Sequence, residues 1–378
     1  MPWREVSAVS QRYEFVMLAS QQGANVSALC RSFGISRTKG YKWLARYAQE
    51  GASGLADRSR RPKRSPTRTA PAIERTVTAV LAKHPTWGSR KVRNHLLARG
   101  CCAVPAASTI TGIKHRHGLI AAEDSARSKR FIRFEHAAPN ELLQLDFKGH
   151  FAIGEGRCHP LTLVDDHSRY SLAIEACADE RGETVQERLT RAFRRYGLPK
   201  RMTMDNGPPW GADADHPMTA LTLWLIRLNI RVSHSRPYHP QTQGKNERFN
   251  RTLNEDVIAG RVFQRLIDCQ TAFDRWRHVY NFERPHDALA GKVPASRFAP
   301  SPRAFPERLP EITYPEGACV RKVQHAGRIS YKGRELRLSK ALRGYPVALQ
   351  PRPEDESLIE VFFCSTPVAR IDLKNPVN

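Results

Sequence analysis

Residues 142–149 read LLQLDFKG, and at this point the sequence changes from helical periodicity to the alternation of a β-strand. The pattern predicts Leu143, Leu145 and Phe147 on one side of the strand and Asp146 on the other. The stretches HFAI (150–153), PLTLVDD (160–166) and YSLAIEA (170–176) follow, separated by the turn sequences GEGR and DHSR. We expect them to extend the first strand into a three-stranded antiparallel meander.

Helices and strands alternate after this meander. An amphipathic helix is predicted over residues 183–196, where Gly197 ends it, and RMTMD (201–205) reads as a strand. A helix near 217–229, a short strand in IRVSHS (230–235) and a longer helix from about Gln243 complete the series. The order β-β-β-α-β-α-β-α is the layout of the ribonuclease-H-like fold. It predicts an α/β core over residues 138–260, with a mixed five-stranded sheet and helices.

The N-terminal segment, residues 1–56, has the pattern of a helix-turn-helix domain. An apolar-periodic stretch ends at a break over residues 34–36, and a second helix follows, in which Tyr41 and Leu44 are expected to face the first. Ser36 can cap the second helix. Its outward face carries side chains able to reach phosphates and base edges in a major groove: Arg37, Thr38, Lys39 and Lys42. An ordinary helical hairpin is the alternative.

Two basic linkers enclose a second helical segment. Residues 57–70 are rich in proline and carry Arg58, Arg60, Arg61, Lys63 and Arg64. Such a linker can track a DNA backbone, or serve only as a solvated tether. Residues 71–120 regain helical periodicity and predict a second helix-turn-helix domain, and residues 121–137 form the second basic linker.

The charge of the chain favours a polyanionic partner. The 378 residues include 61 Lys plus Arg and 37 Asp plus Glu, a net charge of +24. Residues 1–137 carry 25 basic and 8 acidic side chains, so the excess is concentrated there. This asymmetry favours nucleic acid over a membrane as the partner. No apolar run approaches the ~18 residues of a membrane span, so we expect a cytoplasmic, nucleoid-associated protein.

Three carboxylates fall at particular places in the predicted core. Asp146 lies in the first strand, Asp205 at the end of the fourth, and Glu247 in the first turns of the last helix. The first and fourth strands of a ribonuclease-H-like sheet are neighbours, so the three would cluster. Clustered carboxylates suit Mg²⁺ or Mn²⁺, and two such ions can support in-line attack on a phosphodiester. Asp165, Asp166, Asp213 and Asp215 are rival carboxylates.

The stretches around Asp205 and Glu247 also have simpler interpretations. MDNGPPW (204–210) is rich in turn residues, and alone it indicates a turn. On the last helix, Phe249, Leu253 and Val257 mark the buried face, with Glu247, Arg251 and Asn254 opposite. That outer face reads either as a solvated surface with a weak ion pair, or as an active site where basic residues hold DNA phosphates. Those basic residues are Lys245, Arg248 and Arg251.

QLDFKG (144–149), TMDNGPPW (203–210) and SRPYHPQTQGKNERFNRTL (235–253) resemble the core motifs of DDE transposases of bacterial insertion sequences, whose core is similar to retroviral integrases. The resemblance covers most of the chain and implies that Asp146, Asp205 and Glu247 are the three metal ligands, with Asp146 shared by two ions. The same resemblance implies that Arg251 contacts DNA. One departure is the 41-residue spacing between Asp205 and Glu247, where the family has about 35; the extra length is expected within residues 211–218.

The rest of the chain completes the expected organisation. Residues 261–311 predict a helical extension with Phe273, Trp276 and Tyr280 inward, then a Pro-rich linker, and residues 312–378 predict a small SH3-like β-barrel. The resemblance implies a multimeric transposase that binds inverted-repeat ends and joins them to target DNA. The alternatives are a catalytically inactive or domesticated DNA-binding regulator of the same architecture, and a simple metal-dependent nuclease.

Overall fold

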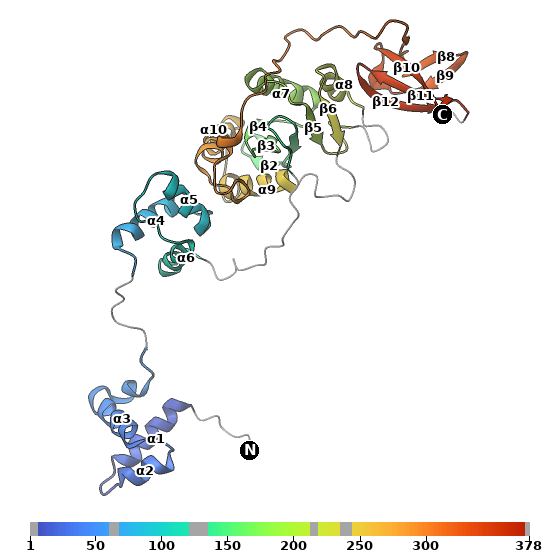
Figure 1. The fold of residues 1–378 in the computed structure, drawn as a ribbon. Helices are drawn as coiled ribbons and strands as arrows, with labels where there is room; N and C mark the ends of the chain where they lie inside the picture. Colours follow the sequence, from blue (N-terminus) through green and yellow to red (C-terminus); the bar gives the residue numbers. More distant parts are fainter. Residues whose placement is uncertain (1–6, 60–67, 121–134, 212–217, 235–243, 375–378) are drawn as a thin grey trace. The chain divides into compact units, whose positions relative to one another are not determined.

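The computed structural model describes residues 7–59, 68–120, 135–211, 218–234 and 244–374 (Figure 1). The chain divides into two compact units, Met1–Arg68 and Thr69–Asn378. Each unit has its own apolar core. Within the described residues, no helix combines the length and apolarity that crossing a membrane requires.

The first unit is a three-helix domain with a helix-turn-helix. Helix α1 spans Ala8–Ala19, α2 spans Val26–Ser32 and α3 spans Arg37–Glu50. A 3₁₀ turn, Gly51–Leu55, continues α3. The side chain of Ser36 accepts a hydrogen bond from the Lys39 amide at 3.3 Å and so begins α3, as predicted. Gly34, at φ +63°, makes the turn between α2 and α3.

The prediction that Tyr41 faces the other helices is wrong. A Cβ at Gly40 would lie 2.5 Å from Cys30 Sγ, so α3 crosses its neighbours at Gly40. Residues three and four positions further share that face of a helix. Trp43 is accordingly buried and Leu44 packs against the same core, whereas Tyr41 is 57% exposed on the outer side.

The second unit begins with the second helical region, which we define as residues 69–120. It contains α4 (Pro71–Lys83), α5 (Ser89–Ala98) and α6 (Ala107–Arg116). The three helices share one core around Trp87, formed by Val77, Leu81, Val92, Leu96, Ile110 and Ile113. The helical periodicity read from the sequence is thus confirmed.

The central sheet has the mixed topology expected of a ribonuclease-H-like core. Strands β1 (Leu143–Phe147), β3 (Gly156–Asp165) and β4 (Ser171–Cys177) are antiparallel. On the other side of β1, β5 (Arg201–Met204) and then β6 (Arg231–His234) run parallel to it. The sheet has six strands where five were predicted, because Phe151–Ile153 forms a separate short strand, β2, on the start of β3.

Helices cover both faces of this sheet. One face packs against α7 (Gly182–Tyr196) and α8 (Ala220–Arg227), and its core contains Leu143 and Leu145. The opposite face packs against α9 (Gly244–Leu253) and α10 (Leu266–His278). Two π-helical segments, Asn254–Ile258 and Val279–Glu283, continue α9 and α10. Alternation along β1 therefore directs Asp146 toward the α9 face.

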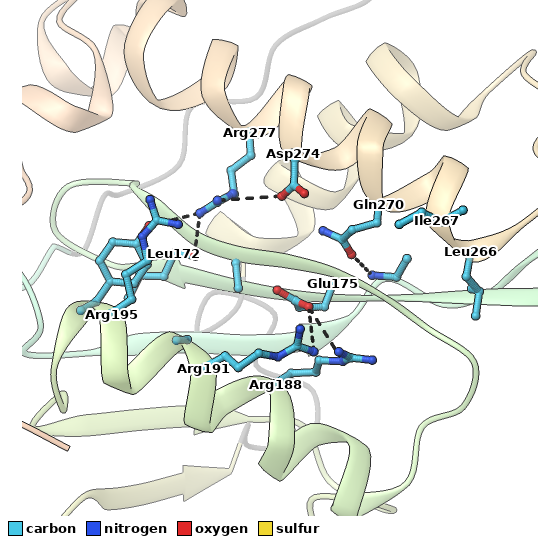
Figure 2. A pocket seen from close by; sticks show the side chains of 14 residues that line it. Leu172, Glu175, Arg188, Arg191, Arg195, Leu266, Ile267, Gln270, Asp274 and Arg277 are labelled. Carbon is cyan, nitrogen blue, oxygen red and sulfur yellow. Dashed lines mark hydrogen bonds and ion pairs between the residues drawn. The ribbon is translucent and has the colours of Figure 1, made fainter. Parts of the chain in front are cut away.

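Side chains of α10 and the π-helical segment after it cover the outer edge of β4. The Gln270 amide accepts from the Ala176 backbone N–H at 2.8 Å and donates to the Ile174 carbonyl at 3.0 Å. Arg277 donates to the Leu172 carbonyl at 2.7 Å, and Asn281 makes the same paired contact with Ser171. A cavity lies beside this edge between α7 and α10, where Glu175 faces arginines of α7 (Figure 2).

The C-terminal strands form two sheets on a common core. Strands β7 (Cys319–Lys322), β10 (Pro346–Arg352), β11 (Asp355–Phe363) and β12 (Thr366–Asp372) form one sheet. Strands β8 (Arg328–Tyr331) and β9 (Arg334–Arg337) form a hairpin. Leu223 and Ile226 of α8 join this core. None of the strand pairs in the described residues closes the two sheets into a barrel, so the barrel stays a prediction. Short 3₁₀ turns lie at Asp287–Leu289, Pro294–Arg297 and Lys340–Leu342.

Candidate active site and DNA-contacting surfaces

Asp146 lies near the carboxyl end of β1, opposite Thr162 of β3. Its side chain is half-buried, and the Asn250 amide of α9 donates a 2.9 Å hydrogen bond to Asp146 Oδ2. Asn250 itself accepts from the Thr162 hydroxyl at 3.2 Å. The sheet and the helix thus fix this carboxylate from two sides.

Asp205 follows the last residue of β5, beside β1. The parallel register pairs Leu143 with Met202 and Gln144 with Thr203. Continuing the same register by two residues brings Asp205 level with Asp146. Asp205 is exposed, and its backbone carbonyl accepts a hydrogen bond from His234 Nδ1 at 2.9 Å.

The turn that MDNGPPW indicates is present after Asp205, so this part of its interpretation is confirmed. Gly207 has φ +86°, and its carbonyl accepts from the Trp210 amide at 2.9 Å. Trp210 is buried, with its ring centroid 5.5 Å from that of Phe147. The turn is therefore anchored in the core, and it holds Asp205 at the edge where β1 ends.

Helix α9 crosses this edge of the sheet. Its buried face contains Phe249 and Leu253, as predicted, and the π-helical segment that follows contributes Val257. Glu247 is exposed on the outer face. The helix is fixed by Asn246 and Asn250, whose amide oxygens lie 3.4 and 3.2 Å from the Thr162 hydroxyl.

The electrostatics connect the three predicted carboxylates. Burial raises the pKa of Asp146 to about 7, and the negative charges of Asp205 and Glu247 act in the same direction. The hydrogen bond from Asn250 opposes the rise. A carboxyl with so high a pKa, beside two further carboxylates, is the environment that a divalent cation stabilises, and the oxygen donors fit Mg²⁺ or Mn²⁺.

The described residues do not hold a complete metal site. Within them, no three acidic, histidine or cysteine side chains lie close enough to bind one ion. The structure places Asp146 and Asp205 on neighbouring strands and Glu247 on the helix above them, without bringing their oxygens to one point. Side chains would have to move to complete a ligand set.

The rival carboxylates of PLTLVDD have structural partners. Asp165 is fully buried and accepts from the amides of Asn140 and Ser168 at 2.8 and 2.7 Å. Asp166 accepts from the Gln144 amide at 3.0 Å and pairs with the Lys245 ammonium at 2.5 Å. The hydrogen bonds of Asp165 and the ion pair of Asp166 therefore stabilise the loop after β3. Asp213 and Asp215 lie outside the described residues.

The basic residues predicted on α9 divide into two kinds. Arg248 and Arg251 are exposed beside Glu247, where a DNA phosphate can reach them. Lys245 is half-buried on Asp166, and burial lowers its pKa. Lys245 therefore holds the start of α9 against the loop after β3, a task that the sequence did not indicate.

The basic residues predicted on the first unit are exposed where the structure describes them. Arg37, Thr38, Lys39 and Lys42 lie on the outer face of α3, and the exposed Tyr41 lies among them. Arg58 forms an ion pair with Glu50. Arg60, Arg61, Lys63 and Arg64 lie outside the described residues.

Sequence reasoning missed Asn246 and Asn250 as site residues. Both are buried on a helix whose other buried positions are apolar. Buried amides need hydrogen-bond partners. Two asparagines four positions apart, on either side of Glu247, were the signal in KNERFNR that this face contacts polar groups.

Basic side chains also surround His286, near the end of the helical extension. Burial lowers the pKa of His286 to about 3, and the charges of Arg284 and Lys91 act in the same direction. Burial likewise lowers the pKa of Lys91, to about 8, with Arg284 and Arg248 contributing. His286 Nε2 is buried without a hydrogen-bond partner among the described residues. The neutral imidazole is therefore the form that the fold accommodates.

We expect His286→Gln to flatten the dependence of stability on pH. The folded-state pKa of His286 lies below its ordinary value of 6.5, so the unfolded chain binds the extra proton, and this contribution is present above pH 6.5 and lost as the pH falls. Between pH 6.5 and pH 5.5 it decreases by about 1 kcal/mol. Urea titrations of the wild type and of His286→Gln at the two pH values measure this change in the free energy of unfolding. The exposed His115→Gln is the matched control, and an unchanged slope in His286→Gln would contradict the expectation.

Family models match most segments of the chain. Two integrase core domain models match residues 136–240 and 228–294, and the C-terminal domain of IS481 family transposases matches residues 318–377. A helix-turn-helix domain model matches residues 11–63, and a homeodomain-like model matches residues 39–113.

Proteins of bacterial insertion elements are among the relatives. The uncharacterized 31.7 kDa protein of IS407 from Burkholderia multivorans is 29% identical over 167 residues, 44% of this chain and 58% of that protein. A protein assigned as the transposase of IS5376 from Geobacillus stearothermophilus is 26% identical over 268 residues, 67% of this chain and 64% of that protein. The chain thus spans roughly three fifths of the length of these two relatives.

Among solved structures, the catalytic core domain of the HTLV-2 integrase in complex with magnesium aligns with 43% of this chain and 97% of that chain. The sequence identity is 16% and the TM-score 0.31.

Proposed function

Because the chain contains an integrase core domain, helix-turn-helix domains and an IS481-type C-terminal domain, and is related to insertion-sequence transposases, we propose that it is a DDE transposase acting on DNA ends. It binds the terminal inverted repeats of a mobile element, and it cleaves and joins DNA strands by in-line attack on phosphodiesters. The observation that carries the proposal is the placement of Asp146 and Asp205 on neighbouring strands beneath the helix that bears Glu247.

In the proposed site, Asp146, Asp205 and Glu247 are the catalytic residues and hold two Mg²⁺ or Mn²⁺ ions. When bound there, such ions would supply activation of a water or 3′-hydroxyl and stabilisation of the leaving oxygen. Asn250 holds the Asp146 carboxylate toward α9. The exposed Arg248 and Arg251 bind phosphates of the DNA strand that reaches the carboxylates.

The other proposed tasks follow the expected domain boundaries. Residues 1–56 and 71–120 read the element ends, with base and phosphate contacts from Arg37, Thr38, Lys39 and Lys42. The linker over 57–70 follows the DNA backbone, and residues 312–378 add a basic surface. Two ends must meet in one complex, so the active form is a homo-oligomer on end and target DNA. The protein is then cytoplasmic and associated with the nucleoid.

The deciding experiment uses the full chain and DNA from its own genomic surroundings. Inverted repeats that flank the gene, bounded by short direct duplications, define the end oligonucleotide. With Mg²⁺, the protein should join the 3′ end of that oligonucleotide to a target plasmid, and EDTA should stop the reaction. Specific end binding without joining, in Mg²⁺ or Mn²⁺, would identify a regulator. Digestion of unrelated DNA without joining would identify a nuclease.

A further inference from the structure

The second helical region contacts the same two π-helical segments that extend α9 and α10. Thr86 donates a 2.7 Å hydrogen bond to Asp256 of the first segment. His95 Nδ1 lies 3.3 Å from the Glu283 carbonyl of the second segment, and Lys83 and Arg99 both lie 3.7 Å from the Glu283 carboxylate. Val279, also in the second segment, packs against the apolar core of the second helical region.

The carboxylate of Asp256 lies at the centre of this contact and accepts hydrogen bonds from both sides of it. Its Oδ1 accepts from Thr86 at 2.7 Å, and its Oδ2 accepts from Trp276 Nε1 at 2.8 Å and from Arg284 Nη1 at 2.7 Å. The side chains of Asp256 and Arg284 are only 11% and 8% exposed. One carboxylate therefore connects α9, α10, the chain after α10 and the second helical region.

Asp256 also lies on the element that carries Glu247. Helix α9 and its π-helical continuation run without interruption from Gly244 to Ile258. Near its start this element is fixed by Asn246 and Asn250 on Thr162, and at its end by Asp256. π-Helical turns have wider, less regular hydrogen bonding and recur at functional sites. Asp256 and Glu247 are thus joined by one continuous helical element.

We propose that Asp256 is a positioning residue that couples the second helical region to the orientation of the Glu247 helix. When that region binds a DNA end, the Thr86–Asp256 contact holds the end of the helix in place and so fixes Glu247 above Asp146. The inference rests on the proposed function, because it assigns a regulator to the same catalytic centre. Asp256 touches neither substrate nor the reacting atoms.

Thr86→Val is the decisive variant, because it removes the Thr86–Asp256 hydrogen bond and leaves both the Asp256–Arg284 ion pair and the contacts of Glu283 with the second helical region. Asp256→Asn is the second variant, since it keeps the shape of the side chain but leaves the buried Arg284 without the negative charge of its carboxylate partner. Thr76→Val is the matched control. Thr76 is exposed on α4, and its hydroxyl donates a local hydrogen bond to the Ala72 carbonyl at 3.1 Å.

At saturating end DNA, Thr86→Val should lower the joining rate by about tenfold, the effect of one lost hydrogen bond to a charged group. Binding of end DNA should stay within about twofold of the wild type. In the Asp256→Asn background Thr86→Val should have a smaller effect than in the wild type, because Thr86 then bonds to a neutral amide in place of a carboxylate. Thr76→Val should match the wild type throughout. Joining rates in Thr86→Val equal to those of the wild type would overturn the proposal, as would a loss confined to end binding.

Hydrogen exchange of residues 244–258 in the full chain separates this inference from the proposed function. End DNA should slow exchange there about fivefold or more in the wild type and in Thr76→Val, but not in Thr86→Val. If the wild type joins no DNA and still shows this difference, the transposase function fails and the coupling stands. Equal protection in Thr86→Val and the wild type overturns the coupling, whatever the joining assay gives.

Discussion

Asp205→Asn is expected to abolish strand joining, with a fall in rate on the order of a thousandfold or more, since bound metal contributes several kcal/mol to such reactions. Folding and end binding should be preserved. Asp205 is exposed after β5, and its described hydrogen bond, from His234, is made by the backbone carbonyl. An amide of the same size keeps that bond and loses only the charge.

Joining gels and band-shift titrations with the same end oligonucleotide measure the two effects separately. Asp274→Asn is a suitable control, because Asp274 is an exposed carboxylate on α10. Asp274→Asn should join DNA like the wild type. Wild-type joining by Asp205→Asn would remove Asp205 from the catalytic residues, and loss of end binding would show that the substitution disturbs more than the metal site.

Asn250→Ala is expected to lower the joining rate by about 10- to 100-fold and to raise the Mg²⁺ concentration needed for half-maximal activity, the usual cost of removing a group that orients a metal ligand. Asn250 donates to Asp146 Oδ2 at 2.9 Å and accepts from Thr162 at 3.2 Å. Its loss frees the Asp146 carboxylate and leaves the Thr162 hydroxyl with fewer partners.

Initial rates across a Mg²⁺ titration test this expectation. Asn254→Ala is the matched control, since Asn254 lies one turn further along, outside the buried face of the helix. A purely structural role for Asn250 would lower the melting temperature and leave the Mg²⁺ dependence of the surviving activity as in the wild type. That result would contradict the orienting role.

The core of the fold was readable from the sequence because its patterns are local. Alternation in LLQLDFKG gave the side of β1 on which Asp146 lies, and the i, i+4 spacing of Phe249, Leu253 and Val257 gave the buried face of the last helix. Element order then placed the first strand beside the fourth of the predicted series, as the β1–β5 pairing confirms.

What the sequence did not reveal depends on contacts between distant residues. Nothing in the spacing of KNERFNR says that its asparagines meet Thr162, more than eighty positions earlier. The helical periodicity of the sequence predicts Tyr41 on the inner face of α3. The close crossing at Gly40 instead turns the helix so that Trp43 lies on the inner face and Tyr41 is exposed. The two π-helical segments likewise have no sequence signature, and through them the second helical region contacts the core.

The covered edge of β4 has a consequence for how copies of the chain can associate. An open edge strand invites a strand from another molecule, and proteins block this in several ways. Here the Gln270 amide takes the place of a peptide group of the missing neighbour, and Arg277 and Asn281 continue the row. A second copy cannot continue this sheet at β4 without first displacing α10. In the proposed assembly on DNA, the β4 edge is therefore closed to a sheet shared between copies.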